Sequence, residues 1–436
     1  MRLELADFPV KDVRFSKETR YGDGVLGIAK DELIALILED KKVASADLDM
    51  AFPGEQTRIV NIRDVVEPRI KVSGRGCVFP GILGPVETVG EGRTHRLSGV
   101  TVMPSVEYPP TIMSGVTSQA MGIVDMWGPG ARVTPYGSTI NIVPIFKLVD
   151  GVSEIEAHNI IQLAQFRVAH RLAETTRNMV PESVEVFELF KVDPSLPKII
   201  YILSVLTLAQ GPHAYVAFYG MPLRESLPVF VHPNEFFDGA MTTDARQGGG
   251  TRTMTWGWTY HPLILQLLRE HGKRLNFLGV ILQRTFFEAG HSKQVTAIAT
   301  SQMARLLGAE AAIITLTSSS GANFIDVMLT LQACERKGVK TALLTPEWGG
   351  KDGGELPLVF NVPEATAIVS IGSFEHEIKL PPPTKVIGIG DKTELVRYSP
   401  SDESYSPWNE FIPKEWGRIT SGVDWWGGMN LTCKTY

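Results

Sequence analysis

Hydrophobic segments are short and separated by glycine and proline in the first third of the chain, from Met1 to about Pro144. One of them, Arg69-Ile-Lys-Val72, is followed by Ser73-Gly-Arg-Gly76 and then by Phe79-Pro-Gly81. Extended segments bounded by such breakers are typical of β-strands joined by turns. The pattern predicts a β-rich N-terminal region.

The periodicity changes between Ser153 and Arg177, where apolar residues recur at helical spacing. The residues that mark the buried side of this predicted helix are Ile155, Ile160, Leu163, Ala164, Phe166 and Leu172. Three apolar runs suited to buried strands follow, at Lys198–Leu206, Ala214–Tyr219 and Val229–Val231. A second region, of α/β type, therefore begins after the N-terminal strands.

Strand-like runs alternate with helix-length segments from Arg274 to Gly390, which indicates a parallel sheet covered by helices. The predicted strands are Leu275–Leu282, Ala311–Leu316, Thr341–Leu344, Ala365–Ile371 and Val386–Ile389. One amphipathic helix face is marked by Val295, Ile298, Ala299, Met303, Leu306 and Leu307, with Gly308 as its stop. A second helix has Asn323 as its predicted N-cap and ends at Gly338.

A chain of 436 residues is too long for one ordinary core. We expect an α/β protein with a β-rich N-terminal region followed by two α/β regions with largely parallel sheets. The expected boundaries are residues 1–150 for the β-rich region, 151–270 and 271–390 for the α/β regions, and 391–436 for an irregular, aromatic-rich tail.

Composition narrows the class of protein. Forty-eight acidic and 42 basic residues give a net charge of -6 without long runs of like charge, so nucleic acid is not an expected partner. Charges interrupt the apolar residues of the opening MRLELADFPVKD, and no later segment is long enough, so neither a signal peptide nor a membrane span is predicted.

The cysteines, Cys77, Cys334 and Cys433, lie far apart, which suits a cytoplasmic location and no metal centre. Cys334 is expected in the core, and Cys77 is either a redox thiol or a buried residue.

Several separated strings are more specific than any composition. They are Phe8-Pro-Val-Lys-Asp12, Glu67-Pro-Arg69, Phe79-Pro-Gly81, Gly90-Glu-Gly92, His232-Pro-Asn-Glu235, Asp238-Gly-Ala240 and Glu270-His-Gly-Lys273. Through them the chain resembles, over nearly its whole length, the α/β-subunit precursor of component B of the glycine, sarcosine and betaine reductases. The resemblance implies a substrate-recognising enzyme subunit. It also implies a second subunit with a reactive cysteine or selenocysteine, and thiol carrier proteins as reductants.

The chain departs from this family at its centre. In the family the precursor cleaves at an internal cysteine, and the new N-terminus becomes a pyruvoyl group whose carbonyl binds a substrate amine. Between Asp238-Gly-Ala240 and Pro262 this chain has neither Cys nor Ser, and by spacing the triplet Gly248-Gly249-Gly250 takes the place of the cysteine. Attack by one of the threonines in this stretch would leave an oxobutanoyl terminus instead. We therefore expect no pyruvoyl group and predict no other cofactor.

Two features of the central stretch are candidates for substrate binding. Glycine backbones allow close approach of a ligand, and Arg246 and Arg252, on either side of Gly249, can grip a carboxylate or phosphate. The alternative is a flexible loop with solvated arginines. Trp256, Trp258 and Tyr260 alternate, so on a strand they would share one face and could stack on a ligand or a cationic amine. An interface or core contact is equally compatible with them.

Polar residues after predicted strands supply the remaining candidates. His232, Glu235 and Asp238 are candidate catalytic residues and Asn234 a substrate-binding residue, because they follow a strand where α/β sheets often bind ligands. The alternative is that Asn234 or Asp238 caps a turn and His232 is structural. Asn323, in the turn from Ser318, and Asp352, in a glycine-rich loop, are further candidates for substrate contact. A dinucleotide fingerprint is absent, so NAD and FAD are not expected.

The leading hypothesis is the substrate-binding subunit of a heteromeric component B-like reductase or lyase. It would act on a small amine or heteroatom-substituted molecule by thiol or selenol chemistry, without pyruvoyl. One alternative is a non-catalytic scaffold that supports a catalytic partner. Another is a metal-dependent hydrolase or lyase built on the cluster around His232.

Overall fold

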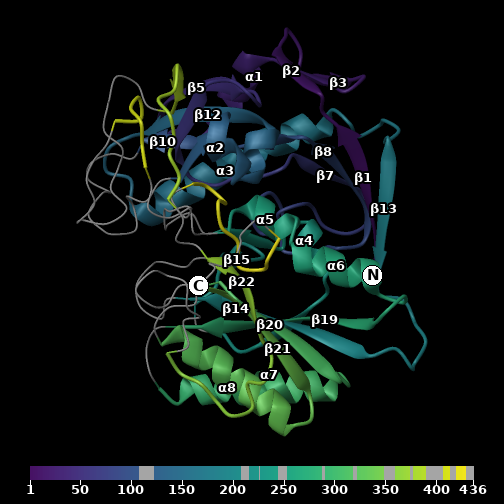
Figure 1. Cartoon of the computed structure of the whole chain (residues 1–436). Coiled ribbons are helices and arrows are strands. Elements are labelled where there is room, and N and C mark those ends of the chain that lie inside the picture. Colours follow the sequence, from purple (N-terminus) through teal and green to yellow (C-terminus); the bar gives the residue numbers. More distant parts are fainter. Residues whose placement is uncertain are drawn as a thin grey trace.

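The computed structural model describes residues 1–107, 122–207, 216–224, 226–243, 253–286, 290–317, 322–347, 359–373, 377–388, 406–412 and 419–428. Figure 1 shows a strand-rich part above and a parallel sheet with two helices below, with α4, α5 and α6 between them. This is the α/β fold class that the sequence predicts.

The N-terminal part consists mainly of strands, as predicted. A four-stranded sheet has the order β13 (Ser183–Glu188), β1 (Arg2–Pro9), β8 (Gly92–Ser98) and β7 (Arg69–Ser73). A seven-stranded sheet contains β11 (Gly122–Asp125), β6 (Thr57–Ile62), β10 (Ser105–Glu107), β12 (Ile140–Leu148), β5 (Val43–Ala51), β9 (Val100–Val102) and β23 (Lys385–Ile387). A small sheet contains β2 (Asp12–Phe15), β4 (Val25–Ile28) and β3 (Arg20–Gly22).

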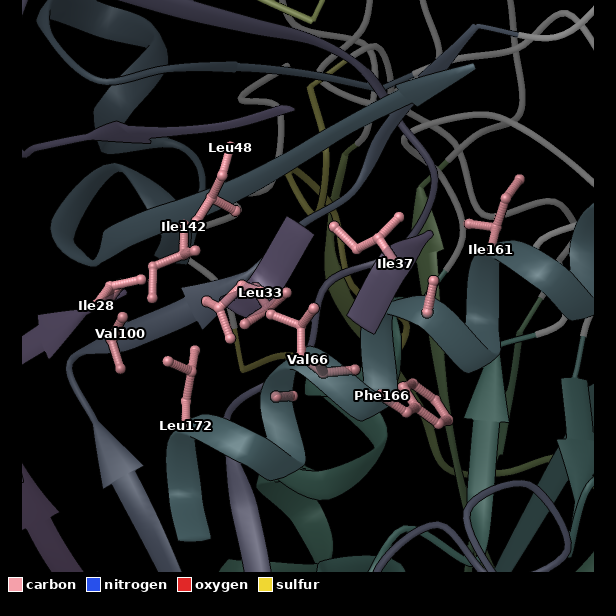
Figure 2. Packing of buried hydrophobic residues seen from close by; sticks show 14 of the residues in the cluster. Ile28, Leu33, Ile37, Leu48, Val66, Val100, Ile142, Ile161, Phe166 and Leu172 are labelled. Carbon is pink, nitrogen blue, oxygen red and sulfur yellow. The ribbon is translucent and has the colours of Figure 1, made fainter. Parts of the chain in front are cut away.

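The predicted long helix is α3 (Glu154–Glu174), and its start is specified by the sequence. The Ser153 hydroxyl accepts a hydrogen bond from the N–H of Glu156, whose carboxylate in turn accepts from the N–H of Ser153. Phe166 and Leu172 of α3 pack in one core with Leu33 of α1 (Lys30–Ile37) and residues of the strands (Figure 2). Two short helices, α2 (Gly128–Arg132) and η2 (Pro135–Ser138), precede β12.

The predicted parallel sheet is confirmed as a six-stranded sheet. Its order is β17 (Val229–Val231), β19 (Asn276–Thr285), β14 (Lys198–Leu206), β20 (Ala311–Leu316), β21 (Lys340–Glu347) and β22 (Ile368–Ser373). All neighbouring strands are parallel except β17, which is antiparallel to β19. Helices α7 (Ser292–Leu306) and α8 (Asn323–Arg336) lie together on one side of this sheet (Figure 1).

Helix α7 is present where predicted, but its apolar face points outward. Val295 is 46% and Ile298 56% exposed. The buried side instead carries polar anchors: Thr300 donates to the side chain of Gln283 at 2.6 Å, and Lys293 pairs with Asp326 at 2.5 Å. A buried donor or acceptor without a hydrogen-bond partner costs free energy. Helix α7 therefore buries the side that carries Lys293 and Thr300, where these groups find partners, and exposes its apolar side.

Three other expectations are corrected. The strand near Val386 exists, but it pairs with β6 of the N-terminal part rather than with the parallel sheet. Asn323 is the first residue of α8 and is fully buried, while Ala322 takes the N-cap position. Residues Thr255–Thr259 form helix α5 instead of a strand, so Trp258 does not share a face with Trp256.

Short elements join the strand-rich part to the parallel sheet. They are β15 (Val216–Phe218), β16 (Met221–Pro222), β18 (Met241–Thr243), α4 (Asn234–Phe237), α5 (Thr255–Thr259) and α6 (Pro262–Glu270). One hydrophobic cluster contains Leu5 of β1, Trp258 of α5 and Leu282 of β19, so the two parts share a core. Among the helices described, none has the length and apolar character needed to cross a membrane.

Candidate functional site

A pocket of about 180 Å³ lies beside Thr253, the first residue described after segment 244–252. Its lining residues are Pro135, Thr253, Trp256, Gly257, Tyr260, Pro262, Ser421, Val423, Asp424, Trp426 and Gly428. Concave sites with mostly apolar and aromatic walls and a few polar groups are typical of small-molecule binding. The predicted Arg246, Gly249 and Arg252 lie outside the described residues, and this pocket adjoins their segment in the chain.

Helix α5, which supplies Trp256 and Gly257 to the pocket, is fixed by the buried carboxylate of Asp64. The N–H of Thr255 donates to Asp64 Oδ1 at 2.8 Å, and the Thr255 hydroxyl donates to Oδ2 at 2.6 Å. The carboxylate thereby satisfies an N–H group at the start of the helix, which has no partner within the helix itself. A residue of the loop after β6 thus positions one wall of the pocket.

The residues on either side of segment 244–252 are hydrogen-bonded to each other in the protein interior. The Thr243 hydroxyl donates to the carbonyl of Thr253, and the Thr243 N–H donates to the Thr255 hydroxyl at 3.0 Å. The Thr243 carbonyl accepts from the amide of Gln162 on α3 at 3.1 Å. Because Thr243 and Thr255 are fully buried, the segment begins and ends at a rigid base next to the pocket.

Trp256 and Tyr260 stack on each other, with ring centroids 4.6 Å apart and planes 25° apart. A buried charge network lies behind Tyr260: its hydroxyl donates to Glu67 and accepts from Arg96 at 3.3 Å, and the Arg69 guanidinium lies 4.9 Å from its ring centre. Burial, followed by the charge of Glu67, raises the pKa of Tyr260, so the phenol is neutral at physiological pH. Two of the three predicted aromatic residues therefore do line a pocket, Trp256 from helix α5 and Tyr260 from the position directly after it.

The opposite wall comes from the C-terminal residues 419–428, which the sequence did not identify. Trp426 stacks on His261 with centroids 3.8 Å apart, and the Tyr201 hydroxyl lies 3.1 Å from His261 Nε2. Burial holds the pKa of His261 well below its usual value, so the ring is neutral. Asp424 Oδ1 accepts from the N–H groups of Trp426 and Gly427, both at 2.7 Å, which shapes the turn. The only sequence signal for this wall was the aromatic character of the tail.

The polar cluster predicted as catalytic lies at a joint between the two parts of the molecule. Asp238 is fully buried, and its carboxylate accepts from the Thr94 hydroxyl at 2.5 Å, from the Gly90 N–H at 2.8 Å and from the Lys71 ammonium. All three donors belong to the N-terminal part. Asp238 therefore fastens the end of α4 to that part.

The neighbouring residues are also bonded within the protein. Glu235 accepts from the His232 N–H at 2.8 Å and from the Tyr219 hydroxyl at 2.6 Å, while His232 Nδ1 accepts from the Asn234 N–H at 3.2 Å. The Asn234 amide donates to the carbonyl of Gly90 at 3.2 Å. Burial raises the pKa of Glu235 and, with the nearby N-terminal amino group, lowers the pKa of His232 to about 4. These contacts describe a structural joint, and the catalytic roles of the cluster stay a prediction.

Strings that carried the family resemblance meet at this joint. The Phe79 N–H donates to the carbonyl of Asp238 at 2.9 Å. Gly90 has φ +99°, and a Cβ there would lie 2.8 Å from the backbone nitrogen of Glu235, so a larger residue would force the joint apart. Phe79, Gly90 and Asp238, which come from three of these strings, therefore have packing roles at the joint.

The other predicted substrate contacts do not converge on the pocket. Asn323 is buried at the start of α8, beyond the carboxyl end of β20, and does not line the pocket. Asp352 lies outside the described residues.

The cysteines show no sign of an activated thiol where they are described. Burial, and then the charges of Glu87 and Asp238, raise the pKa of the Cys77 thiol, which disfavours the thiolate needed for redox chemistry. Cys334 is buried on α8, as predicted, and burial raises its pKa to about 12. Cys433 lies outside the described residues. Within the part of the chain that the structure describes, no group of three or more His, Cys, Asp or Glu residues is arranged to hold a metal ion.

Comparison with known proteins gives a consistent result along the chain. A family model described as glycine/sarcosine/betaine reductase component B subunits matches residues 1–400. The chain is 32% identical over 442 residues to the glycine reductase complex component B subunits alpha and beta of Acetoanaerobium sticklandii, with 100% of both chains covered. It is 31% identical over 402 residues to the sarcosine reductase complex component B subunit alpha of Peptoclostridium acidaminophilum, covering 91% of each chain. The betaine reductase complex component B subunit alpha of the same organism is 32% identical over 398 residues, which cover 89% of this chain and 88% of that one. No solved structure matches.

Proposed function

Because the chain belongs to the family of glycine, sarcosine and betaine reductase component B subunits, we propose that it is the substrate-binding subunit of a heteromeric reductase-like complex. Its relatives are named as components of multi-subunit reductase complexes. In the proposed complex a second subunit carries a reactive cysteine or selenocysteine, and a thiol carrier protein supplies reducing equivalents. The substrate is a small molecule with an amine or another heteroatom on the carbon that is attacked.

One observation carries the proposal: a pocket of about 180 Å³ sits at the base of segment 244–252. By spacing, this segment occupies the place where the family resemblance expects the processed residue. Thr253 ends the segment and lines the pocket. A ligand in the pocket would thus lie where the family has its chemistry.

The central segment supports an enzyme that works without pyruvoyl. Between Ala240 and Pro262 the chain contains neither Cys nor Ser, and Gly248-Gly249-Gly250 offers no side-chain nucleophile for cleavage. We propose that the substrate is held by non-covalent contacts with the pocket walls and that Arg246 and Arg252 contribute to its binding. The partner's thiolate or selenolate then attacks the substrate carbon, and a carbon–sulfur or carbon–selenium bond forms as the carbon–heteroatom bond breaks. The heteroatom group leaves with the electron pair of that bond and takes a proton from solvent where it would otherwise leave as an anion.

The test is to purify the chain together with the subunit encoded beside it, and to assay thiol-dependent loss of small amines and related compounds. We expect a stable complex whose turnover falls in the Trp256→Ala variant. Trp408→Ala is the matched control, because Trp408 is 41% exposed and does not line the pocket. Failure to form a complex, or turnover unaffected by Trp256→Ala, would contradict the proposal.

A second candidate function, a non-catalytic scaffold, is favoured by the contacts of the cluster around Asp238. This carboxylate is fully buried and bonded to three groups of the N-terminal part, as a structural joint requires. The comparison of His232→Gln with Trp256→Ala separates the two functions. A scaffold predicts that neither change alters turnover of the intact complex, whereas a substrate-binding subunit predicts that at least Trp256→Ala does.

A further inference from the structure

Arg284, the last residue but one of β19, carries a positive charge that has no matched partner. Among the described residues, none forms a hydrogen bond or an ion pair with its side chain, and its buried Nε has no acceptor. The two terminal nitrogens of the guanidinium are not buried, so a ligand can reach them. A buried donor without an acceptor costs free energy, and a bound acceptor would recover it.

The neighbouring charges balance one another and leave Arg284 unmatched. Asp326 Oδ2 accepts from Lys293 Nζ at 2.5 Å and from the Phe286 N–H at 3.2 Å, while Asp326 Oδ1 has no partner. The Arg284 guanidinium instead lies over the ring of Phe286, with Cζ 4.6 Å from the ring centre. One net positive charge therefore remains at this end of β19.

The position of Arg284 in the sheet is one that α/β proteins use for binding. β19 and β17, which follow β14 in the chain, lie on one side of β14, whereas β20 and the later strands lie on the other side. Ligands of open α/β sheets bind outside the carboxyl ends of the strands, at the point where the strand order reverses in this way. Arg284 lies opposite Val205, one residue before the carboxyl end of β14.

The side chain of Arg284 leaves the sheet on the face opposite to α7 and α8. The side chain of the preceding residue, Gln283, faces these helices, because it accepts hydrogen bonds from Thr300 of α7 at 2.6 Å and from Thr330 of α8 at 3.2 Å. Successive residues of a strand point to opposite faces, so Arg284 points to the side that packs against the N-terminal part.

This location differs from the pocket beside Trp426. Val205, opposite Arg284, belongs to the same hydrophobic cluster as Tyr201 and Trp426. Tyr201 precedes Val205 by four residues of β14, which corresponds to about 13 Å along the strand. Arg284 therefore marks a second place on this face, closer to the carboxyl ends of the strands.

The chemistry of this place suits an oxyanion. The planar guanidinium presents N–H groups in a fork that matches two oxygens of a carboxylate or phosphate. Its contact with the Phe286 ring restricts the plane of the fork. Helices α7 and α8 begin after β19 and β20, at the same edge of the sheet, and the partial positive charge of their first turns favours an anion further.

We propose that Arg284 forms a second ligand site, which binds the oxyanion group of a small molecule, a carboxylate or a phosphate, at the carboxyl end of β19. The terminal N–H groups donate to two oxygens of the ligand, and the charge of the ligand balances that of the guanidinium. This inference goes beyond the proposed function and does not depend on it, because it assigns a site to the isolated chain.

The first test is modification of the full-length protein by phenylglyoxal, a reagent for accessible guanidinium groups, followed by peptide mass spectrometry. Sodium phosphate, sodium acetate and potassium chloride are added in turn at equal ionic strength. We expect phosphate or acetate at saturation to slow the modification of Arg284 at least about fivefold. Arg75 is the control, because its side chain is 80% exposed and should be modified at the same rate throughout.

The comparison of the ions identifies the source of the oxyanion. The ion that protects Arg284 at the lower concentration shows whether the site prefers phosphate or carboxylate. Acetamide, the neutral counterpart of acetate, should not protect. Equal protection by chloride, or no protection by either oxyanion, would overturn the proposal.

Variants provide the second test, by isothermal titration calorimetry with the protecting ion. Arg284→Gln should weaken binding about tenfold, and Arg284→Lys, which keeps the charge but loses the fork, should weaken it several-fold. Thr285→Val is the matched control: Thr285 is fully buried, its hydroxyl has no partner, and it faces the helices. Unchanged affinity in Arg284→Gln, with an unchanged thermal unfolding curve, would overturn the proposal. If Arg284→Gln does not fold, the protection experiment on the unmodified sequence decides.

Failure of this inference is distinguishable from failure of the proposed function. If the complex turns over a substrate while no oxyanion protects Arg284, the second site falls and the proposed function stands. If an oxyanion protects Arg284 but the chain forms no active complex, the proposed function falls and the site stands.

Discussion

Replacement of Arg58 by methionine tests how C-terminal segments are fastened to the N-terminal part of the molecule. Arg58 is fully buried and makes a two-pronged ion pair with Asp125, at 2.7 and 2.9 Å. Its other N–H groups donate to the carbonyls of Pro381, Pro407 and Asn409, each at 2.9 Å. One side chain thus ties two distant C-terminal segments to β6.

The structure sets the magnitude of this perturbation. Removal of one partner from a buried ion pair leaves an uncompensated charge and costs about 3 to 5 kcal/mol. Arg58→Met also leaves buried carbonyls without donors, so we expect the upper part of that range. Adding Asp125→Asn removes the stranded charge and should restore at least about 1 kcal/mol, which a double-mutant cycle measures.

Urea unfolding, followed by tryptophan fluorescence and far-UV circular dichroism, provides the assay. Arg93→Met is the matched control, because the Arg93–Glu4 pair at 2.6 Å involves an arginine that is 41% exposed and should contribute less than about 1 kcal/mol. A loss of less than about 1 kcal/mol in Arg58→Met, or no coupling to Asp125, would refute the reasoning.

Three further predictions concern residues outside the pocket. The folded-state pKa of His232 is lowered to about 4, so this group contributes stability above the unfolded value near 6.5 that is lost as the pH falls towards 4. His232→Gln should reduce the loss of unfolding free energy between pH 7 and pH 4.5 by about 1 to 2 kcal/mol, as measured by unfolding at both pH values. An equal loss in the unmodified protein and in the variant would contradict this prediction. The raised pKa of Cys77 predicts alkylation by iodoacetamide at pH 7 that is slower than in the unfolded chain, as followed by peptide mass spectrometry; a faster rate would indicate an activated thiol. Ile298→Lys should change stability by less than about 0.5 kcal/mol, because Ile298 is 56% exposed, whereas Thr300→Leu at the buried side of α7 should cost more than about 1 kcal/mol. Thermal unfolding of the two variants checks this prediction. A larger loss of stability in Ile298→Lys than in Thr300→Leu would show that the apolar side of α7 is the buried one.

Apolar runs predicted the parallel sheet well, because central strands buried on both faces leave an unbroken hydrophobic signal. Lys198–Leu206 and Ala311–Leu316 match β14 and β20 at both ends. The long helix at Ser153 was equally readable, since its capping box is local. Signals of this kind depend on neighbouring residues, so contacts between distant parts of the chain do not alter them.

The expectations that proved wrong concern elements whose position or buried side depends on contacts between residues far apart in the sequence. Helix α7 turns its apolar face outward because Lys293 and Thr300 find buried partners that are distant in the sequence. The wall formed by Trp426 depends on a C-terminal segment that folds back over the N-terminal part, and no local pattern specifies such a return. For the same reason the alternation of Trp256, Trp258 and Tyr260 does not identify helix α5, because the start of this helix is set by Asp64, 191 residues earlier.

The central claim is that this family member acts as an uncut chain that binds its substrate without a pyruvoyl group. The intact mass of the protein, purified in complex with its partner, tests the claim most directly. We predict one uncleaved polypeptide of about 47.9 kDa that is unmodified by borohydride or hydroxylamine. Two fragments that meet within residues 241–261, the second with a keto-acyl terminus that reacts with these reagents, would contradict it.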